Sequence, residues 1–207
     1  MRLDLCTDGF NPYIQASSSP YSCWSIIFTP FNIPLEMCMT KPYMFLSCVI
    51  PSPFNQTIGI DVYLQPSIDD LKKLWNGVMT YDVSRKQNFM MRVALMWTIN
   101  DFPTYRMFSS WGTHGRGKTS WFNCHRRFLP TNHAFRRNKN VFKKGEVERD
   151  EPPCMLTPTQ VWRRVRDFPK VTEIGLPPPN IHGYGEWHHL TKRSTFWDLP
   201  YWKDNLL

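Results

Sequence analysis

Two aspartates in the first half of the chain stand where carboxylates can do chemistry. Asp8 follows the mostly apolar residues 3–6, and Asp101 follows the apolar residues 93–99. Carboxylates at neighbouring strand ends can hold two divalent metal ions, about 4 Å apart, that exchange phosphodiester bonds. Their hard oxygens suit Mg²⁺. The alternative is structural, because Asp-Gly is a common turn and an aspartate before Phe-Pro can simply end a strand.

The elements that must position these aspartates have a definite order. Short apolar or β-prone runs predict strands over residues 3–6, 23–28, 44–50 and 93–99. Ser67 offers an N-cap and Gly77 a stop, so an amphipathic helix is expected over residues 67–76, and residues 82–91 favour a further helix. Three strands, a helix and a strand is the order of an RNase H-like sheet. We therefore expect an α/β fold with a partial RNase H-like mixed sheet, followed by a basic, irregular or helical region.

Composition places the chain among globular proteins. It has 207 residues, of which 42% are hydrophobic and 15% aromatic, enough to form a core. No apolar run is as long as a membrane span and no signal-peptide pattern opens the chain, so we expect no membrane partner. The six cysteines are scattered, without a Cys-x-x-Cys pair, which favours reduced thiols over a disulfide framework.

The net charge of +8 lies entirely after residue 100, because the first 100 residues hold seven basic and seven acidic side chains. The basic residues 125–149 interleave cations with phenylalanines, a pattern that suits contact with phosphates and bases. The alternative is that the phenylalanines form core and the cations are only solvated. The candidate DNA contacts are Arg126, Arg127, Arg136, Arg137, Lys139, Lys143 and Lys144.

The last third of the chain has fewer periodic signals. Thr157 to Gln160 resembles a capping box with Pro158 at the first helical position, so a helix is expected from there until just before Pro169. Residues 150–153 and the proline-rich residues 176–180 predict linkers. Residues 196–202 are rich in aromatic side chains.

A nucleotide-binding loop is the main rival function. Residues 112–119 satisfy the pattern G-x-x-x-x-G-K-[ST], which binds phosphate only when a buried strand precedes it and a helix follows it. Residues 105–111 are too polar for a buried strand, and residues 120–123 have no clear helical period. We therefore expect no nucleotide to bind here.

Long strings of this sequence resemble the catalytic region of plant CACTA-type (En/Spm-type) transposon transposases, over nearly the whole chain. The resemblance implies a DDE-type recombinase core that uses Mg²⁺ or Mn²⁺ on DNA at transposon ends, in the nucleus. By this resemblance Asp8 matches the first acid and Asp101 is our choice for the second; Asp61 competes, but it suits a structural role better. The strings are LCTDGFNPY (5–13), EMCMTKPYMFL (36–46), IDVYLQPSIDDL (60–71), MWTINDFPTY (96–105), WGTHG (111–115), SWFNCHRRFLP (120–130) and FWDLPYWKDNLL (196–207).

Three departures from the family pattern concern the site or its support. Relatives extend upstream of the first strand, carry a Cys-x-x-Cys segment after WGTHG, and continue past WKDNLL into a segment expected to supply zinc ligands and the third acid. Cys124 and His125 are all that remains of a structural zinc site, and no glutamate is placed as the third acid. We expect an incomplete, catalytically inactive copy, in which Trp197, Tyr201 and Trp202 lack their usual cover.

These observations divide the chain into three expected parts. Residues 1–115 are the partial RNase H-like catalytic core, and 116–151 are the basic remnant of an insertion. Residues 152–207 are a helical, aromatic-rich C-terminal segment with its proline-rich linker. The expected partner is DNA, with self-association left open. The second rival function is a DNA-binding remnant without catalysis.

Overall fold

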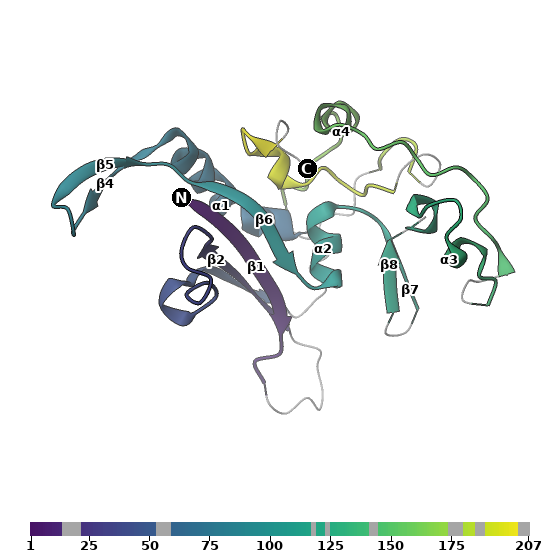
Figure 1. Ribbon diagram of the computed structural model, residues 1–207, viewed down its shortest axis with the longest axis horizontal. Coiled ribbons are helices and arrows are strands. Elements are labelled where there is room, and N and C mark those ends of the chain that lie inside the picture. The colour runs from purple at the N-terminus through teal and green to yellow at the C-terminus, as the bar shows by residue number, and fades with distance from the viewer. Residues whose placement is uncertain are drawn as a thin grey trace.

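A computed structural model describes residues 1–13, 22–52, 59–116, 119–122, 125–140, 145–173, 180–184 and 189–202 (Figure 1). Its centre is a four-stranded mixed sheet of β1 (Arg2–Phe10), β2 (Ser22–Pro30), β3 (Phe45–Ser52) and β6 (Ala94–Asn100). The strand order is β3-β2-β1-β6. Strand β1 is antiparallel to β2 and parallel to β6. The four expected strands and the mixed α/β character are confirmed.

One face of the sheet is covered by α1 (Ile60–Asn76), and the core lies between them. Leu5 and Ile26 of the sheet are fully buried against Ile60, Leu64 and Ile68, which recur every four residues on one face of the helix. The helix therefore begins seven residues before the expected start. The helix runs through the exposed Pro66, so Ser67 lies in its interior and is not an N-cap. The Ser67 hydroxyl lies 2.9 Å from that of Ser47 on β3.

The expected helix over residues 82–91 is wrong, because this segment belongs to an antiparallel ribbon. Strand β4 (Val78–Asp82) pairs only with β5 (Gln87–Met91), and Figure 1 shows the ribbon projecting from the body. The Asp82 carboxylate accepts hydrogen bonds from the backbone N–H groups of Ser84 and Arg85. Lys86 takes a left-handed φ of 52°. These local contacts close a tight turn that competes with helix formation.

Beyond β6 the elements are short. They are α2 (Phe102–Ser109), β7 (Thr113–Arg116), β8 (Thr119–Phe122), α3 (Ala134–Arg137) and α4 (Pro158–Val165), with 3-10 helices η1 (Lys41–Tyr43), η2 (His125–Phe128) and η4 (Thr195–Asp198). The capping box of α4 is confirmed: the Thr157 side chain accepts from the Gln160 N–H, and the Gln160 side chain accepts from the Thr157 N–H. No helix in the described part of the chain is long and apolar enough to cross a membrane.

The segment 189–202 returns to the central sheet and completes its core. Phe196, Leu199 and Tyr201 are buried in the same cluster as the sheet and α1. The Tyr201 hydroxyl accepts the backbone N–H of Leu95 on β6 at 2.7 Å. Trp197 and Trp202 are half-buried. The expectation that these aromatic residues lack cover is therefore wrong, and this segment shares one core with residues 1–115.

A buried ion pair fixes the returning segment to α1. The Lys192 ammonium lies 2.6 Å from the Asp61 carboxylate, and the two side chains are only 2% and 4% exposed. Burial raises the pKa of Asp61, and the charge of Lys192 opposes that rise. The Thr195 N–H also donates to Asp61. Each charge is taken out of water and depends on the other.

We predict that Lys192→Met lowers the free energy of unfolding by about 3–5 kcal/mol, because Asp61 is left buried and unpaired. The double variant Lys192→Met with Asp61→Leu should recover most of this loss, since two apolar side chains of similar size replace the pair. Urea unfolding followed by circular dichroism measures both. Equal stability of the single variant and the wild type would show that the pair carries no such coupling.

Candidate functional site

The parallel register of β1 and β6 brings the two predicted acids to one edge of the sheet. Thr7 lies opposite Asn100 in this register, and Asp8 and Asp101 each follow by one residue. Both aspartates are exposed. Since Leu3 and Leu5 of β1 face α1, the alternation of side chains puts Asp8 on the opposite face. The predicted neighbouring position of Asp8 and Asp101 is confirmed, whereas the expectation that Asp8 follows its strand is wrong, because β1 continues to Phe10 in its pairing with β2. The catalytic roles stay predictions.

Asp101 has a structural task at this edge as well. It is the N-cap of α2, and its carboxylate accepts the backbone N–H of Thr104 at 2.9 Å. This bond fixes the start of α2 directly after β6, and it occupies one lone pair of one carboxylate oxygen. The remaining acceptor positions of Asp101 are available to a cation. The sequence reading of Asp101 as the end of a strand and its reading as an acid of the site are therefore compatible.

Three polar residues beneath this edge were missed by the sequence reasoning. The buried hydroxyls of Thr7 and Thr104 and the buried amide of Asn100 have no hydrogen-bond partner in the described structure. Thr7 and Asn100 are also directly opposite each other. Buried polar atoms are normally satisfied by protein, water or a ligand. This strand end is thus a concentrated polar region, which no pattern in the sequence singled out.

A third carboxyl group lies on the same face of β1 as Asp8. Asp4 is only 1% exposed. Burial raises its pKa from 3.8 to about 6, against the opposing effect of a hydrogen bond with the Trp97 side chain. Burial and the charge of Asp4 together raise the pKa of the neighbouring Cys6 thiol. Asp4 is therefore poorly solvated, whereas Asp8, one residue beyond the last β1 residue that pairs with β6, is exposed.

The expected zinc site is only partly within the described residues. Cys124 lies outside them, and the His125 ring lies 6.1 Å from the Phe135 ring. Across the described residues no three His, Cys, Asp or Glu side chains converge as a metal site would require. Of the glutamates considered as a third acid, Glu148 is paired with Arg127. The expected loss of the zinc site, with Cys124 and His125 as its remnant, stays a prediction.

The basic segment is organised around a buried arginine. Arg136 is 1% exposed, and its guanidinium donates to the backbone carbonyls of Arg126, Arg127, Leu129 and Asp150. In return the Arg126 guanidinium donates to the carbonyl of Arg136. A guanidinium has five N–H donors, which lets one side chain hold several loop carbonyls. Arg136 was expected to contact DNA; its burial corrects that assignment to a structural one.

The other cations of this segment differ in their surroundings. Arg127 pairs with Asp150 at 2.6 Å and with Glu148 at 3.7 Å. Arg137, Lys139 and Arg149 line a cavity of about 440 Å³ beside Arg136, in the company of Glu148 and Glu151. Lys143 and Lys144 lie outside the described residues. Among the described cations of residues 125–149, Arg137, Lys139 and Arg149 therefore share one cavity, a grouping that their order in the sequence does not show.

The described residues of the phosphate-loop pattern lie largely on two paired strands, while its Gly117 and Lys118 lie outside the described residues. Strands β7 and β8 contain its residues 113–116 and 119, and they pair from Thr113 opposite Phe122 to Arg116 opposite Thr119. The helix α2 precedes the pattern, and a strand follows it. A phosphate loop needs the reverse, a strand before and a helix after. The pattern match therefore has no phosphate-loop geometry.

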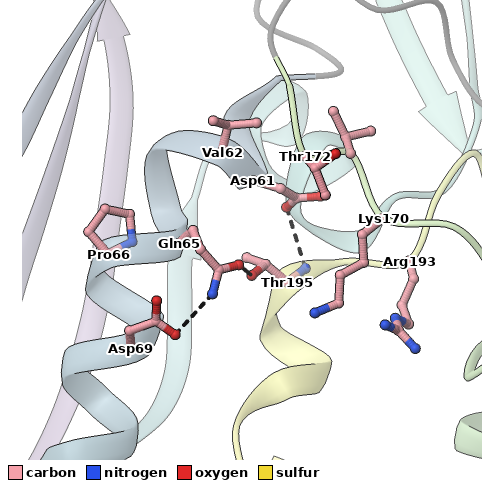
Figure 2. A pocket seen from close by; sticks show the side chains of 10 residues that line it. Asp61, Val62, Gln65, Pro66, Asp69, Lys170, Thr172, Arg193 and Thr195 are labelled. Atoms are coloured by element: carbon pink, nitrogen blue, oxygen red, sulfur yellow. Dashed lines mark hydrogen bonds between the residues drawn. The ribbon is translucent and has the colours of Figure 1, made fainter.

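A cavity of about 460 Å³ lies between α1 and the segments around Lys170 and Arg193 (Figure 2). Figure 2 shows Gln65 bridging Asp69 and Thr195, with Asp61 bonded to the Thr195 backbone. Lys170 is paired with Asp198. Asp61, Asp69 and Lys170 each have an ion-pair partner, and the Arg193 guanidinium donates to the backbone carbonyl of Arg166. The cavity therefore marks the seam where the C-terminal segment docks on α1. The preference for Asp61 as a structural residue agrees with this position.

Comparison with known proteins gives one match. The family model described as "Transposase family tnp2" matches residues 1–168. This range includes the whole central sheet, α1, α2 and the basic segment. No curated protein and no solved structure matches the chain.

We predict that Asp4→Asn stabilises the protein near neutral pH but not at about pH 4. Because the folded-state pKa is raised, the ionised carboxylate costs stability as pH rises from about 4 through 6, reaching about 3 kcal/mol. Asparagine removes that charge and keeps an oxygen for the Trp97 side chain. Urea unfolding at both pH values measures the difference. The exposed Asp70→Asn is the control, and an equal pH response of the two variants would contradict the assignment.

Proposed function

Since the chain belongs to transposase family tnp2, we propose that it derives from a DDE-type DNA transposase of the CACTA (En/Spm) class of plants. Its partner in this proposal is the DNA of transposon ends, in the nucleus. The observation that carries the proposal is the parallel register of β1 and β6, which puts Asp8 and Asp101 at one sheet edge. Carboxylates at adjacent strand ends suit divalent metal chemistry on phosphodiesters.

The strand order gives further support. Three antiparallel-linked strands, a helix and a fourth strand parallel to the first is the arrangement expected of an RNase H-like core. In this arrangement the first and fourth strands are direct neighbours, as β1 and β6 are here, and they supply the first two acids. The inserted β4–β5 ribbon lies between α1 and β6 and leaves this pairing unchanged.

Asp8 and Asp101 would hold the metal, and their environment fits one. Both carboxylates are exposed, so their oxygens are open to a cation. The residues directly before them, Thr7 and Asn100, carry buried polar atoms without a hydrogen-bond partner in the described structure, but the alternation of β1 turns Thr7 toward α1 and away from Asp8. Mg²⁺ or Mn²⁺, when bound, would stabilise charge on a phosphodiester. The residues of this chain contribute acceptor oxygens, and the cap of α2 orients one of them. Oxygen-only ligands suit these hard cations better than zinc.

We extend the proposal to activity: this chain holds two acids of a three-acid site and does not cut DNA by itself. No third acidic or histidine side chain of the described residues completes a metal cluster with Asp8 and Asp101. A missing ligand loosens the metals, and positional precision within about 0.5 Å decides most of the rate. The proposal of a DNA-binding protein without catalysis is favoured by the cations around the 440 Å³ cavity.

We predict that Mn²⁺ binds weakly to the wild type and that Asp8→Asn or Asp101→Asn reduces the affinity by at least tenfold. Asparagine keeps the cap of α2, because its side-chain oxygen accepts the Thr104 N–H as aspartate does. The variants therefore remove charge without removing the helix start. Titration calorimetry with Mn²⁺ alone measures the affinity, and circular dichroism verifies folding.

The control for this titration is Asp70→Asn, an exposed acid on α1 paired with Lys73. Unchanged Mn²⁺ affinity in both site variants would contradict the metal site. A duplex carrying transposon ends provides the second arm, in which the wild type is expected to leave both strands uncut with either Mg²⁺ or Mn²⁺. Cutting that disappears in Asp8→Asn would show that a third ligand is present after all.

We predict that replacing Arg137, Lys139 and Arg149 with alanine flattens the salt dependence of DNA binding. Each lost phosphate contact should reduce the slope of log affinity against log salt by about 1. Fluorescence anisotropy with a labelled duplex over a salt series measures the slope. Arg163→Ala with Arg164→Ala, two exposed cations on α4, is the control. An equal change in the control would mean that general charge, and not this cavity, binds DNA.

A further inference from the structure

We propose that the β4–β5 ribbon, residues 78–91, is a self-association arm that pairs with the same ribbon of a second copy of this chain. The proposal is independent of the chemistry at Asp8 and Asp101. It starts from the exposure of large apolar side chains on both faces of the ribbon. These are Val78, Met79, Tyr81, Val83, Phe89 and Met90, which are 40% to 77% exposed.

The pairing register distributes these side chains over both faces. Met79 lies opposite Met90, while Val78 lies opposite Met91 and Thr80 opposite Phe89 on the other face. Neither face is turned to the core, because the core cluster includes Met91 alone from the ribbon. An exposed surface rich in methionine and aromatic residues is typical of protein interfaces.

The ribbon also exposes backbone hydrogen-bonding groups along its edges. In the described structure β4 pairs only with β5, so the outer edge of each strand is unpaired. Edge strands are commonly protected by lysine, proline or a bulge. Neither VMTYD nor QNFMM contains a lysine or a proline, and their pairing has no register shift. These edges are therefore suited to receiving another strand.

A second copy satisfies this surface by symmetry. A two-stranded ribbon is marginally stable in water, whereas three or more strands with an apolar face are stable. Two ribbons related by a two-fold axis make four strands, and each presents the same patch to the other. The six exposed apolar side chains together offer on the order of 500 Å². With the backbone edge and polar neighbours, this approaches the roughly 800 Å² per partner of a standard interface.

Charge argues against DNA as the occupant of this surface. The strands carry a single charged group, Asp82, and the only cations between them are Arg85 and Lys86 in the turn. Phosphate binding depends on cations along the contact, and here apolar side chains line it. The ribbon joins the body next to Ala94, the first residue of β6, whereas Asp101 follows the last residue of that strand. The two ends of β6 are about 20 Å apart. Pairing through the ribbon therefore leaves the acid edge open.

The test is the mass of the purified chain, measured by light scattering over a wide range of concentrations. The wild type is expected at twice its 24.6 kDa, and Met79→Glu with Met90→Glu at 24.6 kDa, because the charges prevent apolar pairing. Leu46→Glu is the matched control, since Leu46 on β3 is 62% exposed and Met79 is 61% exposed. This control is expected to keep the wild-type mass.

A second variant guards against misfolding of the first. Residues 79–90 are replaced by Asn-Gly, so that Val78 and Met91 remain paired beside a two-residue turn. This shortened chain should also be monomeric, with an unchanged circular dichroism melt of the body.

A wild type that is monomeric at every concentration, or ribbon variants that remain dimeric, would overturn the proposal. The double variant Arg85→Ala with Lys86→Ala gives a further outcome. If it lost affinity for DNA while the two ribbon variants kept the mass of the wild type, the ribbon would bind DNA and the proposal would also be overturned. Asp8→Asn should alter Mn²⁺ binding without altering mass, which separates this proposal from the proposed function.

Discussion

The buried pair of Asp61 and Lys192 is the interaction on which the rest of the structure depends. It joins α1 to a segment more than a hundred residues later, and neither charge has access to water. Once Lys192 is fixed, η4 follows directly, and Phe196 and Leu199 enter the core between α1 and the sheet. Ion pairs of this kind are poor sources of net stability, but they impose one geometry because any other arrangement leaves a buried charge alone.

The consequences of this docking reach the acid edge. Tyr201, placed by the same segment, accepts the N–H of Leu95 and so occupies the open side of β6. Strand β6 in turn lies parallel to β1 and carries Asp101 at its end, where the aspartate caps α2. A chain of contacts therefore runs from the C-terminal segment through β6 to the residues proposed to bind metal. The acid edge depends on elements that contribute no ligand to it.

A second buried cation, Arg136, organises the basic segment in a comparable way. Its hydrogen bonds to backbone carbonyls hold η2, α3 and the backbone at Asp150 together. The other cations of the segment take positions that this packing leaves at the surface. Arg127 is neutralised by acids, whereas Arg137, Lys139 and Arg149 line a common cavity. The family match shows a transposase, and DNA is the general partner that it implies. Which cations face that partner is decided by this loop packing and not by their order in the sequence.

The sequence by itself determined those features that arise from neighbouring residues. The four sheet strands follow from short apolar runs, and α4 follows from a capping box whose two hydrogen bonds join residues three apart. The neighbouring position of Asp8 and Asp101 also followed from the order of elements, since few sheet topologies accommodate that order. Tertiary structure alone decided the start of α1, because packing of Ile60 and Leu64 outweighs the local preference of Pro66 and Ser67. It also decided the burial of Arg136 and of the C-terminal aromatic residues, whose partners are distant in sequence. Such burial depends on long-range contacts that no local pattern encodes, whereas caps and strand periodicity are properties of a single segment.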